Sequence, residues 1–441
     1  MDRYFYRSFV SYSVWITVFL ASGCSVRQAT ERIVDSNEVK RILTTLSADD
    51  MEGRAAFTPG IERAADFIET EFKKAGLQPY TPDGYRQTFS VSRIRPATWE
   101  VSLDGEDIPH EHIIVSSNSP GINWNDEPGV SLIQIRSGDD FAQRFRDVAV
   151  GGKDAIVVID TSFASLFEKY RGFLMQGKII QPGQIKQPVP SIVYVLADQL
   201  PKSFRVSFTN KVEEFPLTNL IGVLPGKSRA GEYVIFSAHY DHIGILAPVG
   251  QDSIANGADD DASGVSAIIS LARYYKRINT HERTLLFTAF TAEELGLVGS
   301  AYFSGQLQAD SVVAMINIEM IGKDAKFGPN SLYVTGYHQS DLAKIMQRNV
   351  EKTGFSFHPD PYPNQNLFYR SDNASLASLG VPAHTFATVQ IDNDSYYHTV
   401  ADEVETLDIQ NIVSSIQAIA LGAKSIVTGK DTPSRIPKLE R

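Results

Sequence analysis

The sequence predicts an α/β fold, with a mixed, mostly parallel sheet flanked by helices and an inserted β-rich domain. Short apolar runs alternate with stretches in which apolar residues recur every three or four positions, as strands and helices alternate in α/β proteins. In residues 91–215 the pattern changes to many short β-like runs broken by Gly, Pro and Asn. Because the flanking segments resemble one α/β unit, we expect residues 31–90 and 216–430 to form one domain and residues 91–215 to be inserted into it.

The elements of the α/β unit follow in order along the chain. The first is an amphipathic helix over residues 61–72, which ends before Gly76. The later elements alternate: the expected strands are residues 233–236, 285–290 and 312–318, and the expected helices are residues 265–272, 342–350 and 409–416. Within the insertion, residues 155–159 and 191–196 are expected strands. The sheet therefore lies mainly in the C-terminal half.

The N-terminal segment is typical of a signal peptide over residues 1–24. Arg3 and Arg7 precede a mainly apolar run over residues 9–21, which is shorter than the roughly 20 residues of a membrane-spanning helix. The small residues that follow lead to Cys24, the only cysteine, in a pattern that resembles a bacterial lipobox. We expect export to the cell envelope, as a periplasmic or outer-membrane lipoprotein anchored at Cys24 or as a secreted protein. An anchoring helix, or cleavage that discards Cys24, is the alternative.

Composition limits the classes of function. Of 441 residues, 43% are hydrophobic and 21% charged, which is ordinary for a globular protein. A formal net charge of -11 and the lack of a Lys/Arg block argue against nucleic acid as a partner. A single cysteine excludes an internal disulfide. No oligomeric state is predicted.

Ionisable residues stand where the predicted strands end. His239 closes an apolar strand, and Asp241 could accept the second ring N–H of a metal-bound histidine. Asp259, Asp260 and Asp261 repel one another unless a dication is present, and one carboxylate can bridge two metals. The structural alternatives are an incidental His-x-Asp triplet and a solvated loop in which Asp261 or Ser263 caps the following helix.

Two further strands end in carboxylates. Glu293 and Glu294 cannot point the same way, so one can bind metal while the other contacts a water. Glu319 follows an apolar run, where a buried charge needs a partner, and His398 follows Tyr397 near the C-terminus. Each has a structural alternative, such as an exposed helix start or a packed histidine. Their meeting at successive strand ends of one sheet nevertheless predicts a metal site.

These motifs resemble those of metallopeptidase family twenty-eight, the two-zinc exopeptidases that include bacterial leucine aminopeptidases and glutamate carboxypeptidase. The resemblance covers the helix near Glu62 and the chain from Asn219 to the final helix, and it implies the phosphorylase/hydrolase-like fold of zinc exopeptidases. The insertion resembles a protease-associated domain. The strings that carry the resemblance are His239-Tyr240-Asp241-His242, Asn256-Gly257-Ala258-Asp259-Asp260-Asp261-Ala262-Ser263-Gly264, Ala292-Glu293-Glu294 and Tyr397-His398.

The resemblance implies a ligand set for two zinc ions. His239 and Glu319 would bind one ion, Glu294 and His398 the other, and Asp260 would bridge both. Relatives usually have Asp where this chain has Glu319, which keeps the charge but is longer by about 1.5 Å. The resemblance therefore predicts that Glu319→Asp keeps or improves activity.

The resemblance also implies the reaction, which is hydrolysis of N-terminal residues from peptides by a metal-activated hydroxide. Glu293 would be the general base, Tyr397 would stabilise the oxyanion, Asp241 would orient His239, and the Asp260–Asp261 bond would be cis. Two alternatives stay open: a glutaminyl-cyclase-like aminoacyltransferase with one zinc, and a catalytically silent binding module of the same fold.

Overall fold

The computed structural model describes residues 1, 34–180 and 189–439. The predicted signal peptide and Cys24 lie outside the described residues, so export and lipid attachment stay predictions. Among the residues that the structure does describe, no helix combines the length and the hydrophobicity needed to cross a membrane.

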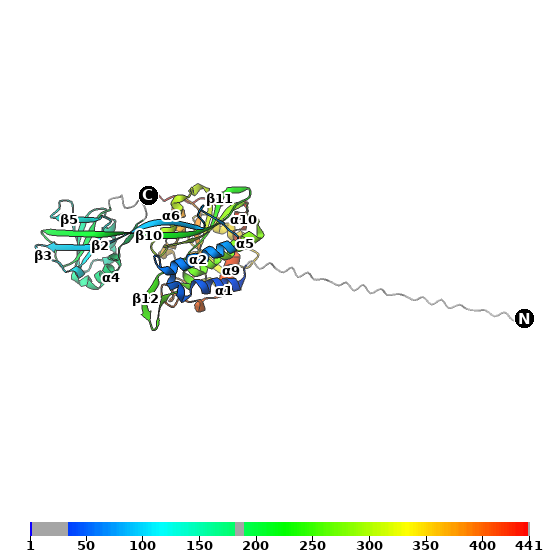
Figure 1. Cartoon of the computed structure of the whole chain (residues 1–441), viewed down its shortest axis with the longest axis horizontal. Coiled ribbons are helices and arrows are strands. Elements are labelled where there is room, and N and C mark those ends of the chain that lie inside the picture. Colours follow the sequence, from blue (N-terminus) through cyan, green and yellow to red (C-terminus); the bar gives the residue numbers. More distant parts are fainter. Residues whose placement is uncertain (2–33, 181–188, 440–441) are drawn as a thin grey trace. The chain divides into compact units, whose positions relative to one another are not determined.

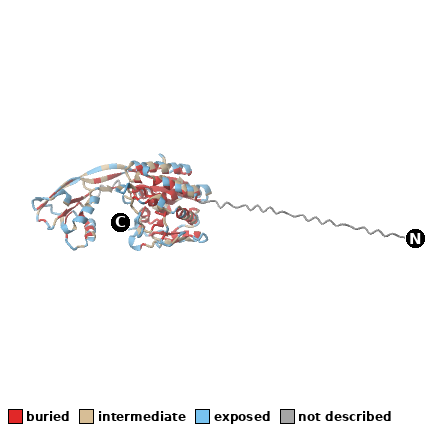
Figure 2. Cartoon of the chain, turned by 90° about the horizontal axis from the view of Figure 1, so that it is seen from below, coloured by how far each residue is buried: buried red, intermediate tan, exposed pale blue. Residues whose placement is uncertain are grey.

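The main sheet is built around four parallel strands. These are β11 (Arg229–His239), β14 (Arg283–Phe290), β15 (Val312–Ile318) and β18 (Ala383–Ala387), in the spatial order β14, β11, β15, β18. The two flanks are antiparallel to this centre: β10 (Phe204–Leu224) pairs with β14, and β16 (Ser331–Val334) pairs with β18. The prediction of a mixed, mostly parallel sheet is confirmed. Figure 2 shows buried residues concentrated around these central strands.

Helices cover both faces of this sheet, which is why its strands are continuous apolar runs rather than alternating ones. Phe236 of β11 stacks on Tyr275 of α5 (Gly264–Ile278), with ring centroids 5.4 Å apart. Its neighbour Ile235 points the other way and joins a core cluster with Phe303 of α6 (Val298–Gln306) and Leu376 of α8 (Asn373–Ala377). The helices α1 (Ser36–Leu46), α2 (Pro59–Lys74) and α9 (Ile409–Gly422) contact α5 (Figure 1).

The predicted elements of the α/β unit form where the apolar spacing placed them. The helix expected at residues 61–72 is α2, which begins at Pro59, and the helix expected at residues 342–350 is α7 (Leu342–Val350). Residues 285–290 and 312–318 lie in β14 and β15, as predicted. The remaining elements of this unit are β1 (Gln78–Pro79), β12 (Gly244–Val249), β13 (Asp252–Ala255), β17 (Ser356–Pro359) and α10 (Lys424–Val427).

The insertion is connected through two long strands. β2 (Arg86–Leu103) and β10 form one antiparallel ladder with a bulge at Thr209/Asn210. The two predicted domain boundaries are paired in this ladder, since Val91 lies opposite Phe215. A second sheet has the order β4-β9-β7-β6. The domain boundaries and the protease-associated likeness stay predictions. The elements between the two strands are β3 (Glu106–Asp107), β4 (Ile113–Ser116), β5 (Gly121–Asn125), β6 (Ser131–Ile135), α3 (Phe141–Val150), β7 (Ala155–Ile159), α4 (Ala164–Leu174), β8 (Lys178–Ile180) and β9 (Ile192–Leu196).

Replacing Phe236 tests the packing between α5 and the sheet. Its ring is fully buried between Tyr275 and Phe287, so we expect Phe236→Ala to lower the free energy of unfolding by about 3–5 kcal/mol. Denaturant unfolding of the full chain measures this. Phe173→Ala is the matched control, because that ring is 75% exposed and its loss should change the free energy by less than about 0.5 kcal/mol. Equal effects of the two variants would contradict the packing.

Candidate metal centre

The parallel strands deliver their last residues to one edge of the sheet. His239 is the final residue of β11 and pairs with Phe290, the final residue of β14. Glu293 and Glu294 follow β14 by a short turn, and Glu319 comes directly after β15. The carboxyl ends of parallel strands are where α/β proteins build their sites, and the structure brings all five predicted metal ligands together there.

The three adjacent aspartates have separate roles. The Asp260–Asp261 bond is cis, as predicted. Asp261 accepts hydrogen bonds from the backbone N–H groups of Gly264 at 2.9 Å and Met320 at 3.2 Å, so the capping alternative is correct for this residue. Asp259 accepts the N–H of Gly322 at 2.7 Å. Asp260 is the member of the triplet that is left to face the histidines.

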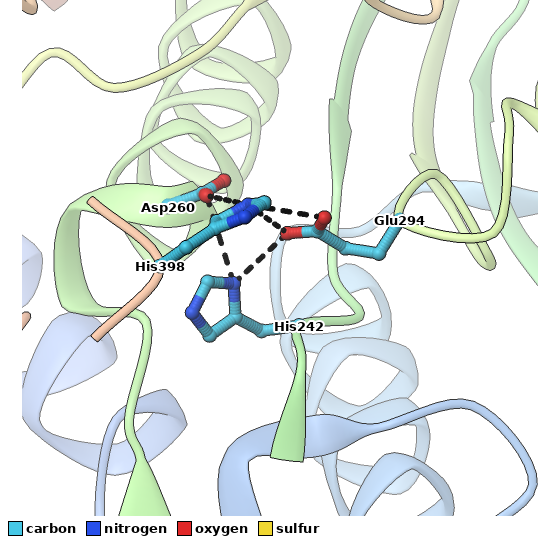
Figure 3. Close-up of side chains that lie close together, drawn as sticks. All are labelled: His242, Asp260, Glu294 and His398. Atoms are coloured by element: carbon cyan, nitrogen blue, oxygen red, sulfur yellow. Dashed lines mark hydrogen bonds and ion pairs between the residues drawn. The ribbon is translucent and has the colours of Figure 1, made fainter. Parts of the chain in front are cut away.

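Asp260 faces two groups of donors, one with each carboxylate oxygen. Its Oδ1 lies 3.1 Å from His239 Nε2, and its Oδ2 lies 3.3 Å from His398 Nε2. His239, Asp260 and Glu319 form one group, whose donor atoms lie within 4.8 Å of one another. The second group consists of His242, Asp260, Glu294 and His398, whose donor atoms also lie within 4.8 Å of one another (Figure 3). Of these four residues, His242 was not among the predicted ligands. This is the arrangement expected of a carboxylate that bridges two metals.

The donors fit metal ions. Glu319 Oε2 is buried and has no hydrogen-bond partner, which is costly unless another group binds it. His239 Nε2 is also buried, and it lies 3.1 Å from Asp260 Oδ1 without a hydrogen bond of good geometry. Burial opposes protonation of His398, yet the nearby Asp260 and Glu294 raise its pKa to about 10. The carboxylates of this second donor group thus carry more negative charge than the nearby positively charged side chains neutralise. Imidazole and carboxylate donors in sets of three and four are what zinc binds in proteins.

A buried arginine fixes the loop that carries Asp260. The Arg54 side chain is fully buried, and its guanidinium donates to the carbonyl oxygens of Tyr240 at 2.8 Å, Asn256 at 2.6 Å and Gly257 at 2.9 Å. Asp402 completes the support, because its carboxylate accepts the N–H of Asp260 at 3.0 Å. The sequence interpretation assigned no role to Arg54, since nothing in its local sequence marks it.

Asp241 supports the site differently from the prediction. Its carboxylate Oδ1 lies 3.9 Å from His239 Nδ1, whereas its backbone carbonyl is 3.1 Å from that nitrogen. The carboxylate instead accepts the N–H groups of Glu293 at 3.1 Å and Glu294 at 3.2 Å. The predicted orientation of His239 by the Asp241 carboxylate is therefore corrected: the carbonyl orients His239, and the carboxylate holds the backbone of the two glutamates.

Glu293 and Tyr397 line a cavity beside these groups. Burial raises the pKa of Glu293 well above its usual range; the charge of His239 opposes this shift, and that of Glu319 adds to it. Burial, with the charges of Asp260 and Glu294, also raises the pKa of Tyr397, so its hydroxyl stays protonated. The Tyr397 ring stacks on His398 with centroids 3.9 Å apart. A proton acceptor and a hydrogen-bond donor thus face the same space.

The remainder of the cavity has a mixed lining, in which Thr335, Arg370, Ser371 and Thr385 are polar and the other residues are apolar or aromatic. Arg370 also lines the neighbouring hollow together with Glu293 and Glu294. The apolar lining comes from the ends of β15, β16 and β18 and from the segments near them: Met320, Tyr333, Leu367, Ala387, Val389 and Ile391.

Comparison with known proteins agrees with this geometry. The profile of peptidase family M28 matches residues 219–422, the segment that carries all of these donors. Residues 219–422 belong to peptidase family M28. The structure is similar in fold to the aminopeptidase from Aneurinibacillus sp. strain AM-1, with a TM-score of 0.56 at 18% identity over 92% of this chain and 96% of that one. The zinc aminopeptidase from Bacillus subtilis gives 0.55 at 18% identity over 90% and 97%.

The sequence relatives match this chain over only part of their own length. A vacuolar membrane protease of Schizosaccharomyces pombe is 24% identical over 57% of this chain and 28% of its own length. A probable zinc metalloprotease of Pyrenophora tritici-repentis is 35% identical over 24% of this chain and 24% of its own length. The chain thus matches only about a quarter of each of these relatives. The M28 match supports a zinc peptidase.

Shortening Glu319 tests the first donor group. The Glu319 carboxylate lies in one donor group with His239 and Asp260, and an aspartate would withdraw it by about 1.5 Å. The placement therefore favours glutamate, whereas the resemblance favours aspartate. We expect Glu319→Asp to weaken zinc binding at this group by at least about tenfold, measured as zinc per chain after dialysis against a chelator. Glu213→Asp, in the β2/β10 ladder, is the control. Unchanged zinc retention in Glu319→Asp would restore the original expectation.

Proposed function

We propose that the chain is a two-zinc aminopeptidase that removes N-terminal residues with apolar side chains from peptides. The observation that carries the proposal is the pair of donor groups sharing Asp260 beside Glu293, on the wall of a cavity that six apolar or aromatic residues, from Met320 to Ile391, also line. The M28 match and the likeness in fold to zinc aminopeptidases support it.

The two donor groups would hold the ions. Bound zinc supplies a Lewis acid and lowers the pKa of water to about 7. The ligands Asp260, Glu294 and Glu319 bring three negative charges against four positive ones. The protein therefore leaves the centre electropositive enough to favour a nucleophilic hydroxide over water at neutral pH.

Glu293 moves the proton in this proposal. Its carboxylate takes one proton from the attacking water while the oxygen of that water bonds to the scissile carbonyl carbon. The same carboxylate then delivers the proton to the leaving nitrogen as the C–N bond breaks, which releases the free amino acid and the shortened peptide. Glu293 lines the cavity beside the donor groups, where a carboxylate is placed to accept and return a proton.

Tyr397 stabilises the oxygen on which charge develops. Its hydroxyl remains a donor because burial and the carboxylates Asp260 and Glu294 raise its pKa. Stacking on His398 fixes the ring relative to the second donor group. A prepositioned donor of this kind acts on the transition state more than on the substrate.

The apolar side of the cavity determines the substrate preference. Met320, Tyr333 and Val389 belong to one core cluster, and they line the cavity together with Leu367 and Ile391. Burying an apolar side chain there would stabilise the complex by about 1.5–3 kcal/mol. We expect Leu and Met aminoacyl substrates to have higher kcat/KM than Asp or Glu substrates.

A panel of aminoacyl and N-blocked substrates tests the function with the purified full chain. Release of apolar residues from unblocked peptides, lost on chelation and restored by zinc, is the expected result. Cyclisation of N-terminal glutamine without hydrolysis would favour the aminoacyltransferase alternative. Zinc binding without turnover of any substrate would favour the silent binding module, and cleavage of N-blocked peptides would contradict the aminopeptidase.

Replacing Glu293 with glutamine separates proton transfer from metal binding. The amide keeps the shape of the side chain but cannot accept the proton, so we expect kcat to fall by about 10²–10⁴-fold while zinc per chain is unchanged. Glu351→Gln, at an exposed position, is the control and should leave kcat unchanged. Retention of most activity in Glu293→Gln would remove Glu293 from this role.

Export to the cell envelope is part of the proposal, since the predicted signal peptide and Cys24 precede the described residues. An enzyme placed there would act on peptides outside the cytoplasm.

A further inference from the structure

His242 belongs to the second donor group, although the family resemblance did not imply that it binds zinc. It lies three residues after His239, beyond the end of β11, and is 1% exposed. Its Nδ1 points at the carboxylates of Glu294 and Asp260, the two residues that His398 Nε2 also faces (Figure 3). Two imidazole nitrogens and two carboxylates thus converge on one point.

The separations among these donors match a tetrahedral ion. Zinc bonds of about 2.0–2.1 Å place neighbouring tetrahedral ligands about 3.3 Å apart. His242 Nδ1 lies 3.1 Å from Glu294 Oε1 and 3.7 Å from Asp260 Oδ2. His398 Nε2 lies 3.1 Å from Glu294 Oε1 and 3.3 Å from Asp260 Oδ2. His242 is therefore as close to Glu294 as the predicted ligand His398 is, and its contact with Asp260 is longer than that of His398.

We propose that His242 Nδ1 is a direct zinc ligand that completes a four-donor set with Asp260, Glu294 and His398. The inference rests on the proposed zinc centre but not on the reaction. The other group, His239, Asp260 and Glu319, offers three protein donors. Sets of four protein ligands are typical of tightly held zinc, whereas sets of three are typical of catalytic zinc. The two positions therefore differ: the four-donor position retains its ion, and the three-donor position exchanges it.

The position of the His242 ring is fixed by the backbone. A Cβ added to Gly257 would lie 2.7 Å from both Cγ and Cδ2 of His242, so the loop preceding Asp260 packs directly against the ring. Gly257 has a φ of +59°, a conformation that favours glycine. The imidazole is thus held in place by the protein backbone, as expected of a ligand in a well-supported site.

The simpler role for His242 is to donate a hydrogen bond from Nδ1 to Glu294 and so orient a neighbouring ligand. Two substitutions distinguish these roles, because each keeps a polar atom near the place of Nδ1. His242→Asn supplies an N–H donor but no strong zinc ligand. His242→Asp supplies a carboxylate ligand but no donor. A ligand role predicts that the aspartate variant retains zinc better, and an orienting role predicts that the asparagine variant does.

The experiment uses the full chain loaded with zinc and dialysed against increasing concentrations of a chelator, with zinc per chain as the readout. We expect the wild type to pass through a plateau of one zinc per chain. His242→Asn should lose that zinc at a free zinc concentration more than about 100-fold higher than the wild type does. Loss of a partner that only orients a ligand lowers zinc affinity by about 10–100-fold, so a larger loss indicates a ligand. His242→Asp should bind zinc more tightly than His242→Asn. His281→Asn, at a buried histidine that contacts the Pro225 carbonyl, should behave as the wild type.

X-ray absorption spectroscopy of the protein with one zinc bound measures the number of imidazole ligands per zinc. Two imidazoles per zinc in the wild type and one in His242→Asn are the expected results. One imidazole in the wild type, or better retention in His242→Asn than in His242→Asp, would overturn the assignment. Because zinc count and imidazole count are independent of turnover, a chain that binds two zinc ions but cleaves no peptide would contradict the proposed function and leave the test of His242 intact.

Discussion

The site depends on a concentration of buried carboxylates that are stabilised mainly by backbone N–H groups. Asp241, Asp259, Asp261 and Asp402 are all fully buried, and burying an unpaired charge is costly. Each accepts backbone N–H groups: Asp241 from the turn after β14, Asp259 from Gly322, Asp261 from the ends of β11 and β15, and Asp402 from the loop of Asp260. Asp259 also lies 3.5 Å from the ammonium of Lys323. The negative charge that attracts metal is therefore also the network that fixes the backbone carrying the ligands.

Arg54 is the cation at the centre of this network, yet its hydrogen bonds go to carbonyl oxygens rather than to carboxylates. Burial lowers its pKa, and the charges of Asp402 and Asp260 oppose that shift. The guanidinium thus offsets part of the carboxylate charge at a distance while it holds the loop of Asp260 in shape. Because Arg54 does not occupy the carboxylate oxygens, those of Asp260 remain available to the histidines and to metal.

The sequence predicted the parts of the site that depend on strand ends. His239, Glu294 and Glu319 could be placed because apolar runs locate strands and the topology brings their carboxyl ends together. The contribution of His242 could not be separated from that of His239, since a spacing of three residues beyond a strand does not determine which way a loop turns. The two helices α3 and α4 were missed in the expected β-rich insertion, although Phe141, Phe145 and Val148 of α3 lie at helical spacing. The role of Arg54 depends on long-range packing that no local pattern encodes.

Asp260 belongs to both donor groups, so the number of donors in one group affects how the carboxylate is oriented toward the other. If the four-donor group fixes Oδ2 of Asp260, it also fixes the direction of Oδ1, which faces His239 at 3.1 Å. The first ion would then organise the three-donor group before the second ion arrives, and the longer Glu319 side chain would supply the adjustable third donor. A centre of this kind joins a rigid structural half to an exchangeable half through a single carboxylate.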